Sequence, residues 1–396
     1  MKKPRMKYLY VLGSVTIATY SFMNILKDRY DISEHTVYIP MGRDILKVQP
    51  QMGEFDNIIY PSGGLFRNFV RELIMYYRAE HVILHGLFIG TKKLLPILFL
   101  LLLFPNRMSR KLSWIEHGGD LYNWEYPHQN WKKPFIDWMN RKIRISASVL
   151  GVCHPMDERV IRETFATDAP CFYTQMRTMA DPFEVWESVR PQEMRFPKQA
   201  SDNYCYRIQV GHNAFQLGNH IRILDMLEKF KDENIRLIMP MNYGMTGVFG
   251  DVYGGFHYRT AVNQVAQQIF GDKAHQIVKK MQQPNYFRYL WGVDIVIFGL
   301  YRQAALGNIH PLLYMNKKIF LPSKSVVYQW MKEQGLDVYD TDEIPNMTFE
   351  KFVSPPSGKN RAWITDFLTK NSYGLWDSYF EALDAAVNKH SSKSVL

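Results

Sequence analysis

The chain has 396 residues, of which 46% are hydrophobic and 22% are charged. This composition excludes a disordered protein, and the length favours two domains, because single hydrophobic cores stop growing beyond about 250–300 residues. The formal net charge of +10 predicts an anionic partner, namely a nucleic acid, a phosphorylated ligand or an acidic membrane. The three cysteines include no C-x-x-C pair. A disulfide framework or a structural zinc site is therefore disfavoured, and a reducing cytoplasm is expected.

The amino-terminal residues combine a basic start with an apolar stretch, YLYVLGSVTIATYSFMNIL. Secretory signal peptides share this pattern, but the stretch contains several polar residues and no A-x-A site follows it. We therefore interpret residues 8–12 as a first buried strand, followed by a Gly-Ser turn and the start of a helix.

The first half of the chain alternates short apolar runs with helical stretches. Strands are predicted at residues 8–12, 37–39, 57–60, 81–84, 112–115 and 146–152. The helical stretches between them include residues 64–77 and 131–142. Strands separated by helices indicate parallel βαβ units and a doubly wound sheet. We expect residues 1–185 to form one Rossmann-like domain.

A second βα series follows a proline-containing linker, which we place at residues 186–203. Its predicted strands are residues 206–210, 235–239, 295–298, 318–321 and 337–339. Its predicted helices are residues 221–230, 258–270, 307–314 and 325–334. Residues 204–360 should form a second Rossmann-like domain, and residues 361–396 a helical tail that packs back on the domains. Two such domains in one α/β chain indicate the GT-B type of fold, in which they face each other across a cleft that binds ligands.

One apolar segment carries a membrane signal. Residues 94–104 are uninterrupted apolar residues, with cations and no acid on either side. The run is too short to cross a bilayer, which takes about 20 residues. It is either a buried core helix or a helix that dips into an anionic leaflet, and we favour the second interpretation. The predicted membrane-binding residues are Lys92, Lys93, Leu98, Leu101, Leu102, Arg107, Arg110 and Lys111.

Two other features bear on the positive charge. The basic stretch from Lys132 to Arg144 belongs either to the same membrane-facing surface or to a solvated helix face. No recognisable DNA- or RNA-binding motif accompanies the basic residues. We therefore do not expect a nucleic-acid partner.

Titratable side chains follow two strands of the first half. The segment LSWIEHGGDLYNW places Glu116, His117 and Asp120 after the strand 112–115, and His85 follows the strand 81–84. Parallel sheets carry their sites at the carboxyl ends of strands, where a carboxylate or an imidazole can remove a proton from a hydroxyl. The alternatives are that Asp120 caps nearby backbone amides and that His85 is structural.

Polar residues also follow the strands of the second half. Gly211 and Asn213 come after the strand 206–210, and Tyr243 comes after the strand 235–239. Arg302, Gln303 and Asn308 follow the strand 295–298. Glycine lets backbone N–H groups approach an anion, and arginine beside a helix amino terminus suits a diphosphate. A helix-terminal turn with a solvent-facing arginine is the alternative.

Several of these segments together resemble a known family. The segments "HGLF" (85–88), "WIEHGGDLY" (114–122), "VGHNAFQLGNH" (210–220), "MPMNY" (239–243) and "GLYRQAALGNIHPLLY" (299–314) occur in the order seen in glycosyltransferase family 56. This is the TDP-4-acetamido-4,6-dideoxygalactose:lipid II transferase family of enterobacterial common antigen synthesis, often labelled 4-alpha-L-fucosyltransferase. The tail "NSYGLWDSYFEAL" (371–383) is also similar. The resemblance spans roughly residues 80–385, but each motif is short, and the family's tryptophan-glycine-alanine-aspartate run reads His117-Gly118-Gly119-Asp120 here.

The resemblance implies a GT-B glycosyltransferase that inverts the anomeric carbon, needs no metal or other cofactor, and is peripheral on the cytoplasmic face of the bacterial inner membrane. The donor would be a dTDP-activated amino-deoxy sugar and the acceptor a polyprenyl-diphosphate-linked saccharide. We expect Asp120 to be the catalytic base, with His85 the rival and Glu116 third. The expected donor-binding residues are Gly211, Asn213, Tyr243, Arg302, Gln303 and Asn308. The alternatives are a UDP- or GDP-sugar donor on the same fold, and a non-catalytic membrane-associated binding protein of polysaccharide assembly.

Overall fold

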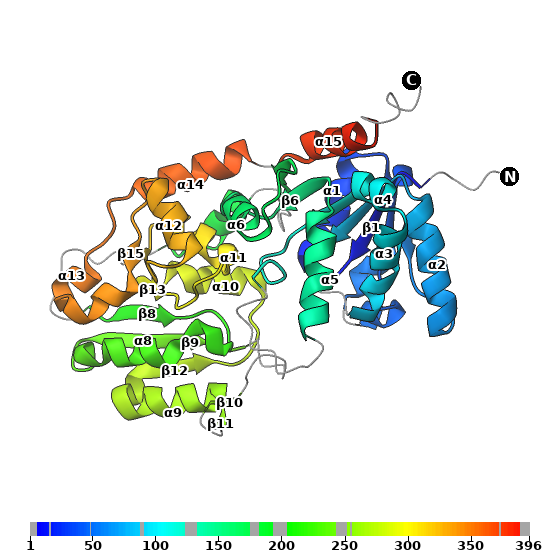
Figure 1. Ribbon diagram of the computed structural model, residues 1–396. Coiled ribbons are helices and arrows are strands. Elements are labelled where there is room, and N and C mark those ends of the chain that lie inside the picture. Colours follow the sequence, from blue (N-terminus) through cyan, green and yellow to red (C-terminus); the bar gives the residue numbers. More distant parts are fainter. Residues whose placement is uncertain are drawn as a thin grey trace. The chain divides into compact units, whose positions relative to one another are not determined.

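The computed structural model describes residues 6–388 except 16, 48, 88–90, 123–132, 175–181, 193–203, 243–251, 254–255 and 372–373. The chain forms two compact units, shown in Figure 1. The first contains Met1–Ala180 together with Asn371–Leu396, and the second is Asp181–Lys370. Helix α7 (Pro182–Ser188) belongs to the second unit, so the segment predicted as a linker from residue 186 begins inside a helix. Proline suits the first turn of a helix because its φ is already fixed near the helical value.

Seven described strands form the sheet of the first unit, in the order β3-β2-β1-β4-β5-β6-β7. They are β1 (Tyr8–Leu12), β2 (His35–Tyr38), β3 (Ile58–Ile59), β4 (His81–His85), β5 (Leu112–Ile115), β6 (Val149–Val152) and β7 (Cys171–Tyr173). Every pairing is parallel. The strand order reverses between β1 and β4, and the register aligns Leu12 with His85 and His85 with Ile115. Three strands therefore end at the same level, at the point where doubly wound sheets place their ligands.

Helices cover this first sheet. They are α1 (Ile17–Arg29), α2 (Leu65–Arg78), α3 (Thr91–Leu103), α4 (Pro105–Lys111), α5 (Lys133–Ile145), α6 (Met156–Phe165) and α15 (Trp376–Asn388). The last of these comes from the carboxyl end of the chain, and its Trp376, Tyr379 and Phe380 join the same buried cluster as Tyr10 of β1. A contact of 2.9 Å between His81 Nε2 and Asp384 Oδ1 also attaches α15 to β4.

The second unit repeats the doubly wound arrangement with six described strands, in the order β12-β9-β8-β13-β14-β15. They are β8 (Tyr206–Val210), β9 (Ile235–Pro240), β12 (Ala274–Ile277), β13 (Ile295–Ile297), β14 (Lys318–Leu321) and β15 (Tyr339–Asp340), all parallel. A short antiparallel pair, β10 (Val252–Tyr253) and β11 (Phe256–His257), precedes α9. Besides α7, the helices are α8 (His220–Leu227), α9 (Tyr258–Phe270), α10 (Gln283–Trp291), α11 (Leu306–Tyr314), α12 (Val326–Glu333), α13 (Phe349–Val353) and α14 (Lys359–Lys370).

The two parallel sheets confirm the predicted α/β fold class. The tail predicted as one segment is divided, because α14 belongs to the second unit and α15 to the first. Strands β7 and β12 were not predicted. Both lie at the edge of their sheets. Strand β7 has only three residues, and β12 contains His275 and Gln276, so neither has the longer apolar run that marks a central parallel strand.

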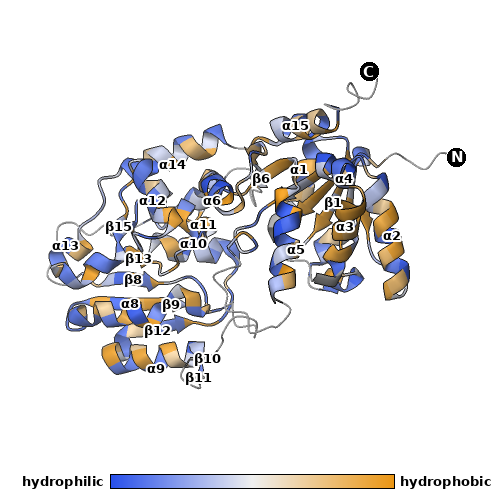
Figure 2. Cartoon of the chain, in the orientation of Figure 1, coloured by the Kyte–Doolittle hydropathy of each residue, from blue (hydrophilic) through white to orange (hydrophobic). Residues whose placement is uncertain are grey.

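The apolar run 94–104 lies almost entirely in α3, which Figure 2 shows as hydrophobic along most of its length. Leu98 and Leu101 are 5% and 1% exposed, so their predicted contact with lipid is wrong: these side chains pack in the core. Lys111 is also buried, and its ammonium donates to the carbonyl oxygens of Tyr77 and Ala79. Leu102 is exposed, as expected of a lipid contact. Within the described residues, no helix has the length and apolarity to cross a membrane.

The remaining cations of the predicted membrane segment differ in their surroundings. Lys93 is half-buried and pairs with Glu72 of α2 at 3.6 Å. Arg107 is exposed, with its guanidinium 4.2 Å from the centre of the Tyr77 ring. Arg110 is half-buried, and the side chain of Lys92 lies outside what the structure describes.

Candidate functional site

The carboxyl ends of β1, β4 and β5 meet at one edge of the first sheet. The backbone N–H of Gly13 donates to the His85 carbonyl at 3.0 Å, and the N–H of Gly86 donates to the Ile115 carbonyl at 2.9 Å. These bonds are the last ones of the parallel ladder before the chain turns away. His85 and the segment that begins at Glu116 are therefore held side by side.

Asp120 ties the loops after β4 and β5 together. Its Oδ1 accepts a hydrogen bond of 2.7 Å from the backbone N–H of His117. Its Oδ2 accepts bonds of 2.8 Å from the backbone N–H of Leu87 and from the indole N–H of Trp114. The residue is 2% exposed. Both carboxylate oxygens therefore accept hydrogen bonds inside the protein. This agrees with the alternative that Asp120 caps nearby backbone amides, and one of those amides belongs to a second loop.

Arg144 supports the same turn from α5. Its guanidinium donates to the Asp120 carbonyl at 2.7 Å and lies 5.0 Å from the centre of the Trp114 ring. Arg144 is buried, so the idea that it belongs to a basic membrane-facing surface is wrong. A stacked arginine that also donates to backbone is a rigid support, because its planar fork fixes both contacts at once.

His117 and His85 form an imidazole pair next to this turn. The Nε2 atom of His117 lies 2.9 Å from the Nδ1 atom of His85, with the ring planes at 71°. His85 is fully buried, 4.4 Å from the ring centre of Phe22, and its Nε2 has no hydrogen-bond partner within the part of the chain that the structure describes. His117 is the less buried member.

Burial sets the protonation of the pair. It lowers the pKa of His85 well below the usual value for histidine, with His117 adding to the effect. Burial also lowers the pKa of His117, while the nearby Asp120 carboxylate acts in the opposite direction. Both rings are therefore neutral at pH 7, and a neutral imidazole can accept a proton.

Glu116 belongs to a separate buried cluster. Its Oε1 accepts from the backbone N–H of Cys153 at 2.7 Å, and its Oε2 accepts from the N–H of Gly118. Burial, with the charges of Asp157 and Asp120, raises the pKa of Glu116 well above its usual range. Burial also raises the pKa of Asp157 to about 7. Glu116 is fully enclosed and its oxygens are occupied, so its geometry favours a structural acid over a base.

Asp157 was not singled out from the sequence. It lies in the first turn of α6, and its Oδ1 accepts from the Tyr122 hydroxyl at 2.8 Å. An acidic residue in the first turn of a helix after a predicted strand was the available signal, but it is typical of ordinary helix starts. The bond to Tyr122 links α6 to the turn that carries Asp120.

In the second unit, Gly211 has a role that differs from the expected one. Its backbone N–H donates to the Ile297 carbonyl at 2.8 Å, so this amide is used within the sheet rather than facing an anion. Gly211 has φ +69°, and a Cβ atom there would overlap Nε2 of the fully buried His220. Asn213 is buried too, and its Oδ1 accepts from the Phe215 N–H at 3.0 Å. Both residues shape the loop before α8.

The residues after β13 surround the amino end of α11. Ala305 precedes the helix with φ +61° and provides no side-chain cap, and the first turn contains no acid. Arg302 is half-buried just before this end, and Gln303 is buried. Asn308 accepts a hydrogen bond of 2.7 Å from the Tyr286 hydroxyl. The amino end of a helix beside an arginine is suited to an anion. Tyr243 lies outside the described residues.

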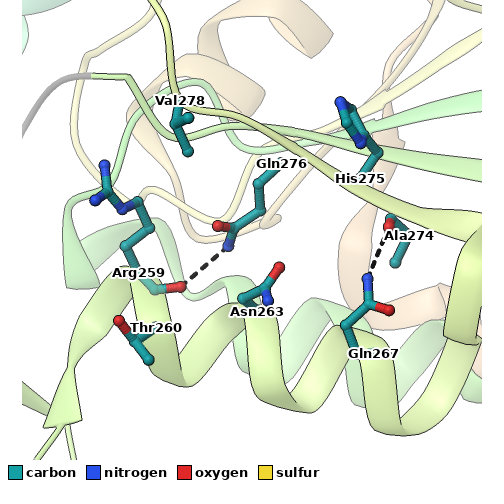
Figure 3. Close-up of a pocket in the computed structure, with 8 residues that line it drawn as sticks. All are labelled: Arg259, Thr260, Asn263, Gln267, Ala274, His275, Gln276 and Val278. Carbon is teal, nitrogen blue, oxygen red and sulfur yellow. Dashed lines mark hydrogen bonds between the residues drawn. The ribbon is translucent and has the colours of Figure 1, made fainter.

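A polar cavity of about 360 Å³ lies between α9 and the edge strand β12. Figure 3 shows Arg259, Thr260, Asn263 and Gln267 on the helix, opposite residues 274–278. Gln276 and Gln267 each donate to backbone carbonyls across it, at 3.0 and 2.9 Å. None of the predicted donor-binding residues lines this cavity. Among the described residues, no group of three His, Cys, Asp or Glu side chains is placed to hold a metal ion.

Two doubly wound parallel sheets in one chain are the arrangement of the GT-B fold class. Solved structures of this class are similar to nearly the whole chain. One is the α,α-trehalose 6-phosphate synthase from Burkholderia multivorans, with a TM-score of 0.59, 8% identity and 98% of both chains covered. Another is a trehalose-6-phosphate protein from E. coli bound with UDP-2-fluoro glucose, with a TM-score of 0.57, 11% identity, and 95% of this chain and 99% of that chain covered. At these identities the likeness shows the fold alone.

A glycosyltransferase from Rickettsia africae is also similar, with a TM-score of 0.52, 10% identity and 98% of both chains covered. The family assignment comes from the sequence. Residues 47–354 match the family described as 4-alpha-L-fucosyltransferase, glycosyl transferase group 56. The chain belongs to this family, as its resemblance indicated.

Proposed function

We propose that the protein is an inverting glycosyltransferase that moves an amino-deoxy sugar from a dTDP-sugar to a polyprenyl-diphosphate-linked saccharide in bacterial surface polysaccharide synthesis. The observation that carries this proposal is the family match over residues 47–354, which includes the strand ends of both units. In this proposal the enzyme is a peripheral protein on the cytoplasmic face of the inner membrane, and its reaction needs no metal.

The first unit supplies the base. Inversion in a single displacement requires that the acceptor hydroxyl oxygen forms a bond to the anomeric carbon while the bond to the diphosphate breaks. The hydroxyl proton passes to the imidazole pair, entering at His117, the less buried ring. His85 orients that ring through the 2.9 Å contact, and the Asp120 carboxylate stabilises the positive charge that develops. This arrangement follows the general logic of an imidazole base held by a partner.

Asp120 as the base itself remains the rival assignment. Its favoured role in this proposal is to position His117, because its oxygens are held by Leu87, Trp114 and His117. The second unit receives the departing nucleoside diphosphate. Arg302 and the amino end of α11 provide positive charge for it, and charge stabilisation of this kind is a large part of glycosyl transfer.

The test is a panel of nucleotide sugars incubated with the purified protein and a polyprenyl-diphosphate acceptor, with the extended lipid detected by mass. Extension by a dTDP-amino-deoxy sugar supports the proposal. Extension by a UDP- or GDP-sugar alone keeps the enzyme class and replaces the donor. No product with any donor, together with tight binding of the acceptor, supports a non-catalytic binding protein of polysaccharide assembly.

A further inference from the structure

The first unit carries a run of exposed apolar side chains on its outer helices, which we call the apolar face. On α2, Leu65 and Phe66 are 75% and 81% exposed. The exposed residues that make up the apolar face are Leu65, Phe66, Val70, Ile74, Phe99, Leu102, Leu103, Phe104, Phe135 and Trp138. Scattered exposed apolar residues are normal on a protein surface, but a contiguous set of large ones marks an interaction site.

The apolar face is contiguous across three helices. Helix α3 packs against α2 on one side and against α5 on the other. Phe69 of α2 and Phe99 of α3 are in edge contact, with ring centres 6.3 Å apart. Tyr77 and Phe104 are in contact at 5.3 Å. The exposed residues of α2 and α3 therefore form one surface rather than separate patches.

The charged side chains that border the apolar face are positive along most of this surface. Arg67, Arg71 and Arg78 are exposed on α2, whereas Glu72, the acid in that helix, is buried. The sequence from residue 91 to residue 111 contains no Asp or Glu. On α5, Asp137 is exposed and is the exception. Apolar side chains bordered by cations match the interface of an anionic bilayer, where acyl chains lie beneath phosphate groups.

We propose that the apolar face, with α2 as its main element, docks on an anionic lipid surface. The proposal deepens the membrane location in the proposed function by naming the docking surface, and it moves that surface from the buried part of α3 to α2. A second copy of the chain fits poorly, because a two-fold interface would bring together two surfaces that are both positively charged.

The position of α2 also suits a lipid-linked acceptor. This helix ends at Arg78, directly before β4 begins. Since the helix must run back along the sheet to reach the start of β4, Leu65 and Phe66 lie towards the carboxyl ends of the strands. His85 and His117 are at that end of the same unit. Docking through Leu65 and Phe66 would hold the lipid surface near the proposed base.

The experiment measures binding of the full chain to vesicles, without donor or acceptor, so its result does not depend on turnover. Phosphatidylglycerol vesicles are compared with phosphatidylcholine vesicles by flotation. We expect Leu65→Ser/Phe66→Ser to reduce the partition coefficient on phosphatidylglycerol at least tenfold. Arg67→Gln/Arg78→Gln should reduce it by about fivefold for each cation and weaken the preference for phosphatidylglycerol.

The matched control is Val278→Ser/Leu375→Ser, two residues that are each 47% exposed outside the apolar face. This variant should bind as the parent does. Melting temperatures of all variants are compared, because the changed side chains are exposed and should leave stability unchanged. Unchanged vesicle binding by the Leu65/Phe66 variant overturns the proposal. A parent that binds no vesicles but is a dimer by light scattering, and a variant that is a monomer, also overturns it.

Discussion

Replacing Asp120 by asparagine separates the two roles proposed for this residue. The change is nearly isosteric, but one acceptor oxygen becomes an NH2 group. The least damaging orientation directs the NH2 group towards the single donor on the Oδ1 side, the His117 N–H, and keeps the oxygen for Leu87 and Trp114. One buried charge-assisted hydrogen bond is then lost, and the His117 N–H faces another donor.

The expected loss of stability follows from the one hydrogen bond that is lost and the one buried donor that is left without an acceptor. A hydrogen bond to a charged group contributes about 1.5–3 kcal/mol, and a buried donor without a partner costs about 1–3 kcal/mol. We expect Asp120→Asn to lower the free energy of unfolding by about 2–4 kcal/mol, which corresponds to a fall in Tm of roughly 4–16 °C for a unit of this size. Because the His117 backbone moves, turnover should also fall, by about 10²-fold.

Calorimetry and initial-rate measurements on the same preparation test this prediction together. If Asp120 positions His117, its replacement lowers both the stability and the activity of the protein. The acid limb of the pH–rate profile should also move, because the negative charge next to His117 is gone. If Tm is unchanged while kcat falls at least 10²-fold, the carboxylate acts on the acceptor directly and the assignment of Asp120 as base is restored. Near-normal kcat removes Asp120 from both roles.

Four further outcomes follow from the same contacts. His85→Gln should lower kcat by about tenfold to 10²-fold. His117→Trp, which introduces the tryptophan of the family pattern, should lower kcat at least as much, and full activity of this variant would place the base elsewhere. The pKa of His117 is lowered from 6.5, and a base acts only when deprotonated, so kcat/KM should be retained at pH 6.5 and be lost only at lower pH. The pKa of Asp157 is raised from 3.8 to about 7, so the folded state binds this proton more tightly than the unfolded state does. The contribution to stability is full below about pH 4 and is lost as pH rises through about 7. Asp157→Asn should therefore have a higher Tm than the parent at pH 8, a smaller advantage at pH 5 and none below about pH 4. Gly211→Ala should lower the free energy of unfolding, measured by chemical denaturation, by about 2–5 kcal/mol, because an alanine there is strained at positive φ and its Cβ overlaps a buried imidazole. The control is Gly307→Ala, which has nothing within 4 Å of its added Cβ and should be neutral or slightly stabilising.

Central strands and amphipathic helices were predictable because burial leaves its pattern in the sequence. The strands 8–12, 112–115, 206–210 and 318–321 were predicted with the bounds that the structure has, since strands covered on both faces are rich in apolar residues. The edge strands β7 and β12 give a weaker signal, because β7 is three residues long and β12 contains two polar residues. Their strand conformation comes from pairing with β6 and β9, which is tertiary information that no local window contains.

Burial on α3 was not predictable from composition alone. The run 94–104 is apolar on all sides, and such a helix reads equally well as core or as membrane surface. The structure divides it: Leu98 and Leu101 face the core, and Leu102 and Leu103 are exposed. On α2 the signal was weaker because arginines interrupt it, although α2 contains the most exposed apolar side chains of the set.

In the candidate site, too, the sequence predicted where the titratable residues lie but not the contacts that they make. Sequence spacing placed Glu116, His117 and Asp120 in one turn, and parallel-sheet logic placed His85 beside them. What spacing cannot show is which oxygen or nitrogen is already occupied. Asp120 reads as a base because it is a carboxylate at a strand end, yet it accepts hydrogen bonds from two loops and from the Trp114 indole of β5.

That convergence also explains how two buried imidazoles can be kept at a fixed separation. His85 ends β4, where the ladder bonds of Gly13 and Gly86 hold its backbone. His117 is outside the sheet, and its backbone would be free to move without the bond from its N–H to Asp120. Since the same carboxylate also holds Leu87, two residues after His85, any shift of the β5 loop is coupled to the β4 loop. The carboxylate therefore maintains the contact between the two rings, and this is why we expect its loss to be felt first in proton transfer and in the stability of the turn.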